Sequence, residues 1–311
     1  MSHPSSHSQN TLVFGLPESM GTIDLIASDM DGTFLDADHN VSDAVLDAVN
    51  RLESHTDILI CPATGRSRMS ALKKLATKGI EWSNRPGVYL NGAIVYGPSG
   101  EVLYENTFGM EILEALISEF EDDTSVAVVM PCSGDTTHAP QICEISLHLH
   151  TDYADPYPAN HAGYKQMRDR LPDLKVHMVA VMTKDCRDSE DQVFERVKRI
   201  VSRFGSLDEF SVVRPIPRMI SIMPRNTSKG TGLLALCKGL SICPSRVAAL
   251  GDAGNDIEML RMVGCGVAMG NAKDEVKMHA KLVVNRNDHS EMPGVAQFIH
   301  HVIDRSPRKQ V

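Results

Sequence analysis

The first of four polar clusters that could carry out chemistry occupies residues 29–33, with the sequence DMDGT. It follows a short apolar run, and alternate residues of an extended strand share one face, so Asp29 and Asp31 should point to the same side. Two carboxylates this close repel one another, and a cation beside them would offset that repulsion. The same residues could also form an ordinary turn with two solvated aspartates.

Two further clusters offer groups that bind phosphate. Thr64, Gly65 and Arg66 lie at a predicted strand-to-helix junction, where a hydroxyl and free backbone N–H groups form a cradle for an anion. Lys229 stands just before a predicted helix and could add a point charge beside the same phosphate. Taken alone, the threonine could be a helix N-cap and the lysine a surface residue.

The fourth cluster, residues 251–256 with the sequence GDAGND, joins a buried strand to a helix. Asp252 and Asp256 supply carboxylates and Asn255 supplies an amide within one turn, and oxygen ligands of this kind suit Mg²⁺. The alternative is a glycine-rich turn in which Asp256 caps the following helix.

Strand and helix patterns alternate at both ends of the chain, which predicts a parallel sheet with helices on both faces. The expected core strands are 23–29, 57–62, 87–90, 247–250, 266–269 and 282–284. In an open α/β sheet the ligand site lies beyond the carboxyl ends of the strands. The four clusters follow such ends or begin the next helix, so they should meet in one crevice.

Between residues 93 and 223 the pattern changes to adjacent strands separated by single helices, which predicts an inserted α+β unit with an antiparallel sheet. Its expected elements are a hairpin around 97–100, strands at 126–130, 142–149, 176–182, 210–214 and 219–223, and helices at 110–121, 161–170 and 190–204. The predicted fold is a doubly wound, Rossmann-like α/β core with an inserted α+β cap. The expected division is a flexible tail at 1–22, a core at 23–108 and 223–311, and a cap at 109–222.

The composition argues against several classes of partner. The formal net charge is −9, so the surface should repel nucleic acid and anionic membranes. No apolar stretch approaches the roughly 20 residues that span a bilayer, and the N-terminus lacks the pattern of a signal peptide. Seven cysteines without a CxxC pair argue against a zinc site and suit a reducing compartment. We therefore expect a cytoplasmic protein, and a monomer or weak homodimer.

In this order, DxDGT, a threonine before Gly-Arg, a lysine and GDxxND resemble the signature of the haloacid dehalogenase superfamily. Segments 91–93, 228–230, 259–260 and 268–271 are similar to the Cof-type branch of sugar-phosphate and related phosphatases. That branch carries a large αβ cap between its second and third motifs. The resemblance extends over the core from about Asp24 to Ile299.

The resemblance implies a Mg²⁺-dependent phosphomonoester hydrolase that acts on a small phosphorylated metabolite through an aspartyl-phosphate intermediate. Asp29 would attack phosphorus, while Asp31 would protonate the leaving oxygen and then take a proton from water. Mg²⁺ would be held by the Asp29 carboxylate, the Asp31 main-chain carbonyl and the Asp252 carboxylate. Asp256 would support the ion through hydrogen bonds around these ligands.

The resemblance also implies which residues contact the substrate. The groups that would bind the phosphoryl oxygens and stabilise the transferring group are Thr64, Gly65, Lys229 and Asn255. Thr64 and Lys229 would count among the catalytic residues. Arg66, Asn91 and polar cap residues would contact the leaving group, and the cap would close over the core and exclude water.

Two alternatives to a hydrolase remain open. In a phosphotransferase or phosphomutase of the phosphomannomutase kind, a sugar hydroxyl would replace water as the phosphoryl acceptor. A non-catalytic protein that binds a phosphorylated metabolite could use the same scaffold. The second alternative would be favoured if Asp29, Asp31, Lys229 or Asp252 were replaced, and all four are present.

Overall fold

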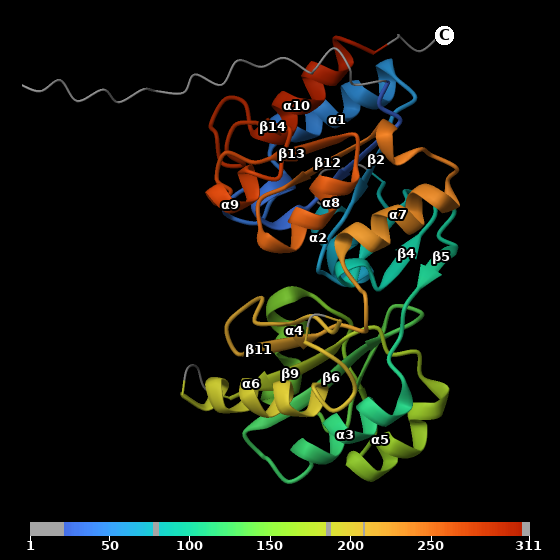
Figure 1. The fold of residues 1–311 in the computed structure, drawn as a ribbon, viewed down its shortest axis with the longest axis vertical. Helices are drawn as coiled ribbons and strands as arrows, with labels where there is room; N and C mark the ends of the chain where they lie inside the picture. Colours follow the sequence, from blue (N-terminus) through green and yellow to red (C-terminus); the bar gives the residue numbers. More distant parts are fainter. Residues whose placement is uncertain (1–21, 77–80, 185–187, 208, 307–311) are drawn as a thin grey trace, which may run out of the picture.

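The computed structural model describes residues 22–76, 81–184, 188–207 and 209–306. The predicted N-terminal tail therefore lies outside the described residues except for Thr22. Figure 1 shows two lobes along the long axis of the molecule, with both ends of the described chain in one lobe and its middle third in the other. Within the described residues, no helix is both long and apolar enough to cross a membrane.

The core lobe is built on a five-stranded sheet in the order β14-β13-β12-β1-β2, with all neighbours parallel. Its strands are β1 Leu25–Ser28, β2 Leu59–Pro62, β12 Val247–Gly251, β13 Cys265–Ala268 and β14 Leu282–Val283. The interior strand β1 is buried along its whole length, as expected for a parallel strand that is covered on both faces. It pairs with β2 on one side and β12 on the other, which brings both ends of the chain together.

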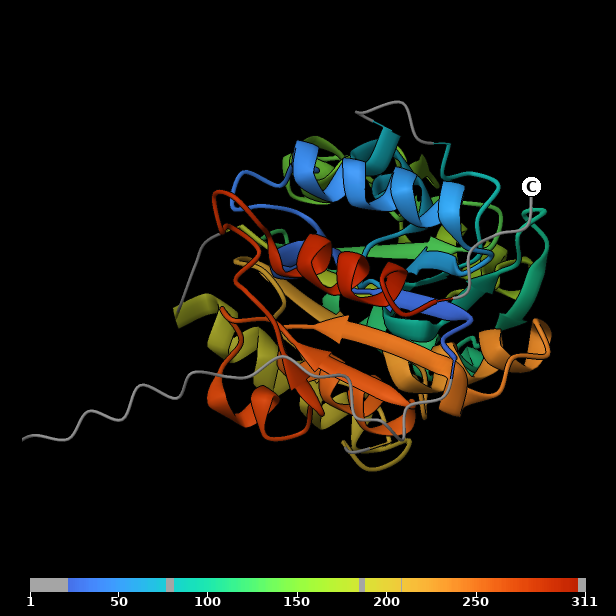
Figure 2. The ribbon, with the colours of Figure 1, turned by 90° about the horizontal axis from the view of Figure 1, so that it is seen from above.

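Helices cover both faces of this sheet, as predicted. They are α1 Asp43–His55, α2 Arg68–Leu75, α7 Lys229–Gly239, α8 Ile257–Met262, α9 Asp274–Lys277 and α10 Gly294–Ile303. Ile26 packs in one apolar cluster with α1 and α10, while its neighbours Leu25 and Ala27 pack in another with α7 and α8. Figure 2 shows α1 and α10 together on one side of the core strands. The prediction of a doubly wound α/β core is confirmed.

A three-stranded antiparallel sheet lies beside the core, formed by β3 Gly87–Tyr89, β4 Ile94–Tyr96 and β5 Val102–Glu105. The hairpin predicted around residues 97–100 is confirmed. The expectation that 87–90 is a parallel core strand is only partly right, because β3 touches the core sheet through the single parallel bridge between Ala63 and Val88. The chain reverses directly after β3, where Leu90, Asn91 and Gly92 all have positive φ.

The cap lobe contains a six-stranded mixed sheet in the order β10-β11-β9-β6-β7-β8. Its strands are β6 Val126–Cys132, β7 Thr136–Ala139, β8 Ala159–Asn160, β9 Val179–Thr183, β10 Val212–Val213 and β11 Met219–Ile222. The helices α3 Met110–Phe120, α5 Tyr164–Arg170 and α6 Asp188–Val201 contribute to an apolar cluster on one face of this sheet. The α+β cap is therefore confirmed, although β7 and β8 are parallel rather than antiparallel.

One predicted cap strand, 142–149, is wrong, because residues Glu144–Tyr153 form the helix α4. Ile145 and Leu149 are four residues apart and both buried, which is the spacing of one helix face. They pack with Ala127 and Val129 of β6 in the cluster that extends into the core lobe. Figure 1 shows α4 on the side of the cap that faces α2.

Candidate active site

The sheet order brings the first and fourth sequence clusters together. Asp29 follows β1 and Asp252 follows β12, and the Asp29 backbone N–H donates to the carbonyl of Leu250 at 2.9 Å. Carboxylate oxygens of Asp29, Asp252 and Asp256 all lie within 4.8 Å of one another. Residues more than 200 positions apart thus converge at the carboxyl ends of adjacent parallel strands, where ligands bind in this class of sheet.

Lys229, the first residue of α7, supplies the positive charge of this group. Its Nζ lies 2.6 Å from Oδ1 of Asp29 and 2.7 Å from Oδ1 of Asp256, and all three side chains are buried. Burial alone would lower the pKa of Lys229, but the charges of Asp256 and Asp29 outweigh it and raise that pKa. Burial raises the pKa of Asp29, Asp256 raises it further, and Lys229 opposes both effects.

Asp256 organises the loop that carries Asp252. Its Oδ2 accepts hydrogen bonds from the backbone N–H groups of Asp252 and Ala253, each at 2.9 Å. Its other oxygen accepts from Lys229, so the completely buried carboxylate has charged and neutral donors around it, as a buried charge requires. Asp256 therefore holds the loop and the lysine in one arrangement.

Two residues outside the predicted site orient the Asp252 carboxylate. Thr33 Oγ1 donates to Asp252 Oδ1 at 2.9 Å. Asn271 Nδ2 donates to the Gly32 carbonyl at 2.7 Å and reaches Asp252 Oδ2 at 3.5 Å. Gly32, with a φ of 79°, lies so close that an added Cβ would sit 2.5 Å from Asp252 Oδ2. Both residues belong to segments that the sequence analysis singled out, since Thr33 ends DMDGT and Asn271 ends segment 268–271. Neither residue was predicted to take part in the site.

Asp31 pairs with Arg66 instead of joining the group of Asp29, Asp252 and Asp256. Arg66 Nε lies 2.7 Å from Asp31 Oδ2 and its NH2 group 2.6 Å from Oδ1, which is a bidentate pair. His39 Nδ1 lies 2.9 Å from the same Oδ1. Burial would raise the pKa of Asp31, but Arg66, assisted by His39, lowers it below its ordinary value. Arg66, predicted to contact the leaving group, is thus engaged with the candidate acid–base residue.

Two further predicted phosphate ligands, Thr64 and Asn255, lie in the segments that follow β2 and β12. The buried Thr64 side chain accepts from the Arg66 backbone N–H at 3.1 Å. Asn91 Oδ1 accepts from Asn255 Nδ2 at 3.0 Å, and an added Cβ on Gly65 would lie 3.1 Å from the Asn91 amide. The structure therefore brings Asn91 against Asn255 and Gly65, two of the residues predicted to bind phosphate.

The turn that presents Asn91 is tightly constrained. Leu90, Asn91 and Gly92 have φ values of 48°, 51° and 97°, and left-handed conformations cost energy for residues other than glycine. The Leu90 and Asn91 N–H groups donate to the carbonyls of Arg66 and Thr64. A Cβ on Gly92 would lie 2.0 Å from the carbonyl oxygen of Ser228. The turn therefore fits directly against the start of α7.

Gly92→Ala is expected to lower the free energy of unfolding by about 3 kcal/mol, because it adds a backbone clash to an unfavourable φ. Chemical denaturation followed by circular dichroism measures the change. Gly109→Ala is the matched control, since an added Cβ there meets nothing within 4 Å. Equal stability of the two variants would show that the turn can move away from α7 at little cost.

The donor set fits a hard divalent cation. Asp29 and Asp252 present carboxylate oxygens toward one another, and oxygen ligands are the ones that Mg²⁺ prefers. Asp252 is oriented by Thr33 and Asn271, which is the outer support that metal ligands commonly have. Burial raises the pKa of Asp252 as well as that of Asp29, so a nearby cation would relieve an unfavourable concentration of negative charge.

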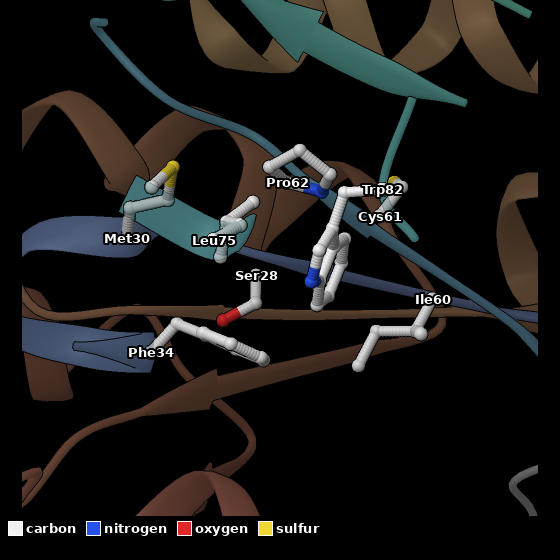
Figure 3. A pocket seen from close by; sticks show the side chains of 8 residues that line it. All are labelled: Ser28, Met30, Phe34, Ile60, Cys61, Pro62, Leu75 and Trp82. Carbon is white, nitrogen blue, oxygen red and sulfur yellow. The ribbon is translucent and has the colours of Figure 1, made fainter. Parts of the chain in front are cut away.

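A small cavity beside Asp29 is apolar, unlike the group of charged residues described above (Figure 3). It is lined by Ser28, Met30, Phe34, Ile60, Cys61, Pro62, Leu75 and Trp82. The space open to the centre of a water molecule is about 10 Å³, which holds at most one water. The cavity is mostly apolar and too small for a metabolite, so it belongs to the packing of the core rather than to the crevice.

Known proteins resemble this chain over most of its length. A family model described as haloacid dehalogenase-like hydrolase matches residues 26–299. The HMP-PP phosphatase of Cronobacter sakazakii is 28% identical over 282 residues, covering 89% of this chain and 95% of that protein. The chloroplastic endoribonuclease YBEY of Arabidopsis thaliana is 28% identical over 282 residues, which are 88% of this chain but 46% of that protein. The chain thus spans about half the length of this second relative.

The fold also has counterparts among solved structures. The crystal structure of TM0651 from Thermotoga maritima matches with a TM-score of 0.75 and 21% identity, covering 90% of this chain and 97% of the other. At that identity the likeness concerns the fold alone. Core and cap are both included in the superposed length.

Proposed function

The chain belongs to the haloacid dehalogenase-like hydrolases, and from this membership we propose that it is a Mg²⁺-dependent phosphatase acting on phosphomonoesters of small metabolites. The observation that carries the proposal is the convergence of Asp29, Asp252, Asp256 and Lys229. A buried carboxylate beside a lysine and further carboxylates suits a nucleophile whose charge must be offset while it attacks an anion.

In the first step, an oxygen of Asp29 forms a bond to phosphorus while the bond from phosphorus to the leaving oxygen breaks. Asp31 gives its proton to that leaving oxygen. In the second step, water attacks the phosphorus of the aspartyl phosphate, Asp31 takes a proton from that water, and the bond to Asp29 breaks. The products are the alcohol and inorganic phosphate, and both aspartates return to their starting forms.

The pairing of Asp31 with Arg66 sets the protonation state of Asp31 in the substrate-free site, and this state suits one of the two steps. Arg66 and His39 favour the ionised form of Asp31, and this is the form that accepts a proton from water. The first step needs the protonated form. A bound phosphate dianion would raise the pKa of Asp31 by its negative charge, so substrate binding itself supplies the condition for that step.

Four residues would hold the transferring phosphoryl group: Thr64, Gly65, Lys229 and Asn255. Asn91 acts through Asn255, since it accepts a hydrogen bond from the Asn255 amide. We propose that the metal is held by Asp29, the Asp31 carbonyl and Asp252, with Asp256 in a supporting position. When bound, Mg²⁺ would neutralise part of the charge between nucleophile and phosphate.

The names of two relatives bear on the class of substrate. A relative named HMP-PP phosphatase and another named 5-amino-6-(5-phospho-D-ribitylamino)uracil phosphatase support a small phosphorylated metabolite, with sugar phosphates among the candidates. We also propose residues 109–222 as the cap and the flanking segments as the core. A cytoplasmic location remains a proposal from the cysteine pattern.

The experiment that tests the function measures phosphate released from p-nitrophenyl phosphate and from a panel of phosphorylated metabolites. With Mg²⁺ we expect release without any added acceptor, and with excess EDTA we expect at least about a hundredfold loss, restored by Mg²⁺. Release that requires an added sugar hydroxyl would favour the phosphotransferase alternative. Release that EDTA leaves unchanged would contradict the assignment of a metal to the carboxylate group.

A further inference from the structure

The turn at the end of α4, residues 153–155, is one of the places where the cap contacts the core. The turn is closed by two contacts within the cap. The Asp155 N–H donates to the Leu149 carbonyl at 3.1 Å, and the His150 ring lies 2.8 Å from the Asp155 carbonyl oxygen. Ala154 between them has a φ of 61°, a conformation that is unfavourable for alanine and persists only where surrounding contacts impose it.

This turn docks on the first turn of α2, which directly follows the predicted phosphate loop. Ser67 is the N-cap of α2, and its hydroxyl accepts from the Ser70 N–H at 3.2 Å. The same hydroxyl donates to Asp155 Oδ1. Asp155, which is 8% exposed, therefore joins the N-terminal cap of α2, where the helix dipole offsets part of the cost of burying its negative charge.

A second branch leads from the same turn to the candidate acid–base residue. Ser70 Oγ donates to the Tyr153 carbonyl at 2.5 Å. Arg66 NH1 donates to that Ser70 oxygen at 3.2 Å, and the other nitrogens of Arg66 hold Asp31. A continuous series of hydrogen bonds therefore connects the cap backbone with Asp31 through two side chains.

We propose that residues 153–155 are the latch that couples docking of the cap to the orientation of Arg66, with Asp155 and Ser70 as positioning residues. The proposal rests on the proposed phosphatase function, because it assigns the latch to that site. Arg68 adds a contact from the same helix turn, since its NH1 lies 3.0 Å from Asp135 Oδ2 in the cap. Contacts from Ser67, Arg68 and Ser70 at the start of α2 thus provide a route by which the position of the cap can be transmitted to the core.

The charge of Asp155 gives the latch a defined pH dependence. Burial raises its pKa from 3.8 to about 6, against the opposing effects of Ser67, Arg66 and His150. The docked carboxyl thus binds its proton more tightly than an exposed one does. Docking is therefore favoured most below about pH 4 and weakens as pH rises through about 6.

The experiment compares four full-length variants with the wild-type protein: Asp155→Ala, Asp155→Asn, Ser70→Ala and the control Asp152→Asn. Asp152 is an exposed neighbour whose carboxylate pairs with His148 on its own helix. Hydrogen exchange of the backbone amides in the first turn of α2 measures docking of the cap independently of enzymatic activity. Steady-state kinetics on p-nitrophenyl phosphate with Mg²⁺, from pH 5 to pH 8, reports its effect on the site.

We expect Asp155→Ala to accelerate exchange in the first turn of α2 and to raise KM, each by about tenfold. Asp155→Asn should keep near wild-type docking, because an amide still accepts from Ser67, but should lose the dependence of KM on pH between 5 and 7. Ser70→Ala should lower kcat several-fold with little change in KM. Asp152→Asn should match the wild type in every measurement.

Two results distinguish failure of the latch from failure of the function. If the wild-type protein released no phosphate from any substrate, the function would be wrong, and the exchange data would still decide whether residues 153–155 dock the cap. If phosphate is released but Asp155→Ala and Ser70→Ala both behave like Asp152→Asn in exchange and kinetics, the latch is overturned and the phosphatase stands.

Discussion

Asp29→Asn is expected to lower kcat by at least about a thousandfold, equivalent to about 4 kcal/mol of transition-state stabilisation. An amide cannot form the covalent intermediate, so the first step is lost rather than slowed. The fold should survive, because burial already disfavours the charged form of Asp29 and the neutral amide has nearly the same shape. Lys229 keeps Asp256 as a partner. Phosphate release and thermal unfolding, measured on the same preparation, test both statements.

The control for this variant is Asp24→Asn. Asp24 lies just before β1 and pairs with Arg246 at the surface, so its replacement should leave turnover unchanged. Mass spectrometry must show that the asparagine at position 29 has not deamidated to aspartate. Substantial turnover by an intact Asp29→Asn protein would remove Asp29 from the role of nucleophile, although it would leave the metal assignment open to a separate test.

Lys229→Met is expected to impair both stability and turnover. The variant leaves the buried carboxylates of Asp29 and Asp256 without the cation that lies between them. Removing one partner of a buried ionic group typically costs about 4 kcal/mol of stability. The loss of a charge beside the phosphoryl group should also lower kcat at least about a hundredfold. Lys238→Met is the matched control, because Lys238 is exposed near the other end of α7.

A double variant separates the two effects of Lys229. Lys229→Met combined with Asp256→Asn removes one carboxylate along with the lysine, and should recover much of the lost stability, because the two positions contact each other directly. It should not recover turnover. If turnover returned together with stability, Lys229 would act only by supporting the fold, and its assignment as a phosphate-binding and catalytic residue would be withdrawn.

The sequence predicted the structure best where a pattern of residue types is compatible with few structures. The alternation of apolar runs with helix patterns was enough to predict the parallel core, and the polar residues at strand ends were enough to predict the crevice. The partners within that crevice were less predictable. Nothing in the spacing of residues 29–33 indicates that Asp31 turns toward Arg66 while Asp29 faces Lys229, because the irregular turn at Met30–Phe34 breaks the alternation of a strand.

The wrong prediction at 142–149 has a related cause. Apolar and polar residues alternate over part of that segment, and His148, Leu149 and His150 read as a strand. The helix α4 forms because Ile145 and Leu149 share one buried face and the Ser146 hydroxyl accepts from the Cys143 N–H at 2.8 Å. Short apolar patterns fit both the helix period and the strand period, and here packing against the cap sheet decides in favour of the helix.

The position of β1 between β2 and β12 has a consequence for synthesis of the protein. Asp29 meets Lys229 across 200 positions of the chain, and the strand that completes its surroundings, β12, ends at Gly251. A nascent chain that has formed β1 and the whole cap still lacks the lysine and two of the three clustered carboxylates. Contacts this distant in sequence form late and slowly. Chains that terminate before residue 252 should therefore be inert toward cellular phosphate esters, and catalysis should begin only after Lys229, Asp252 and Asp256 have emerged from the ribosome.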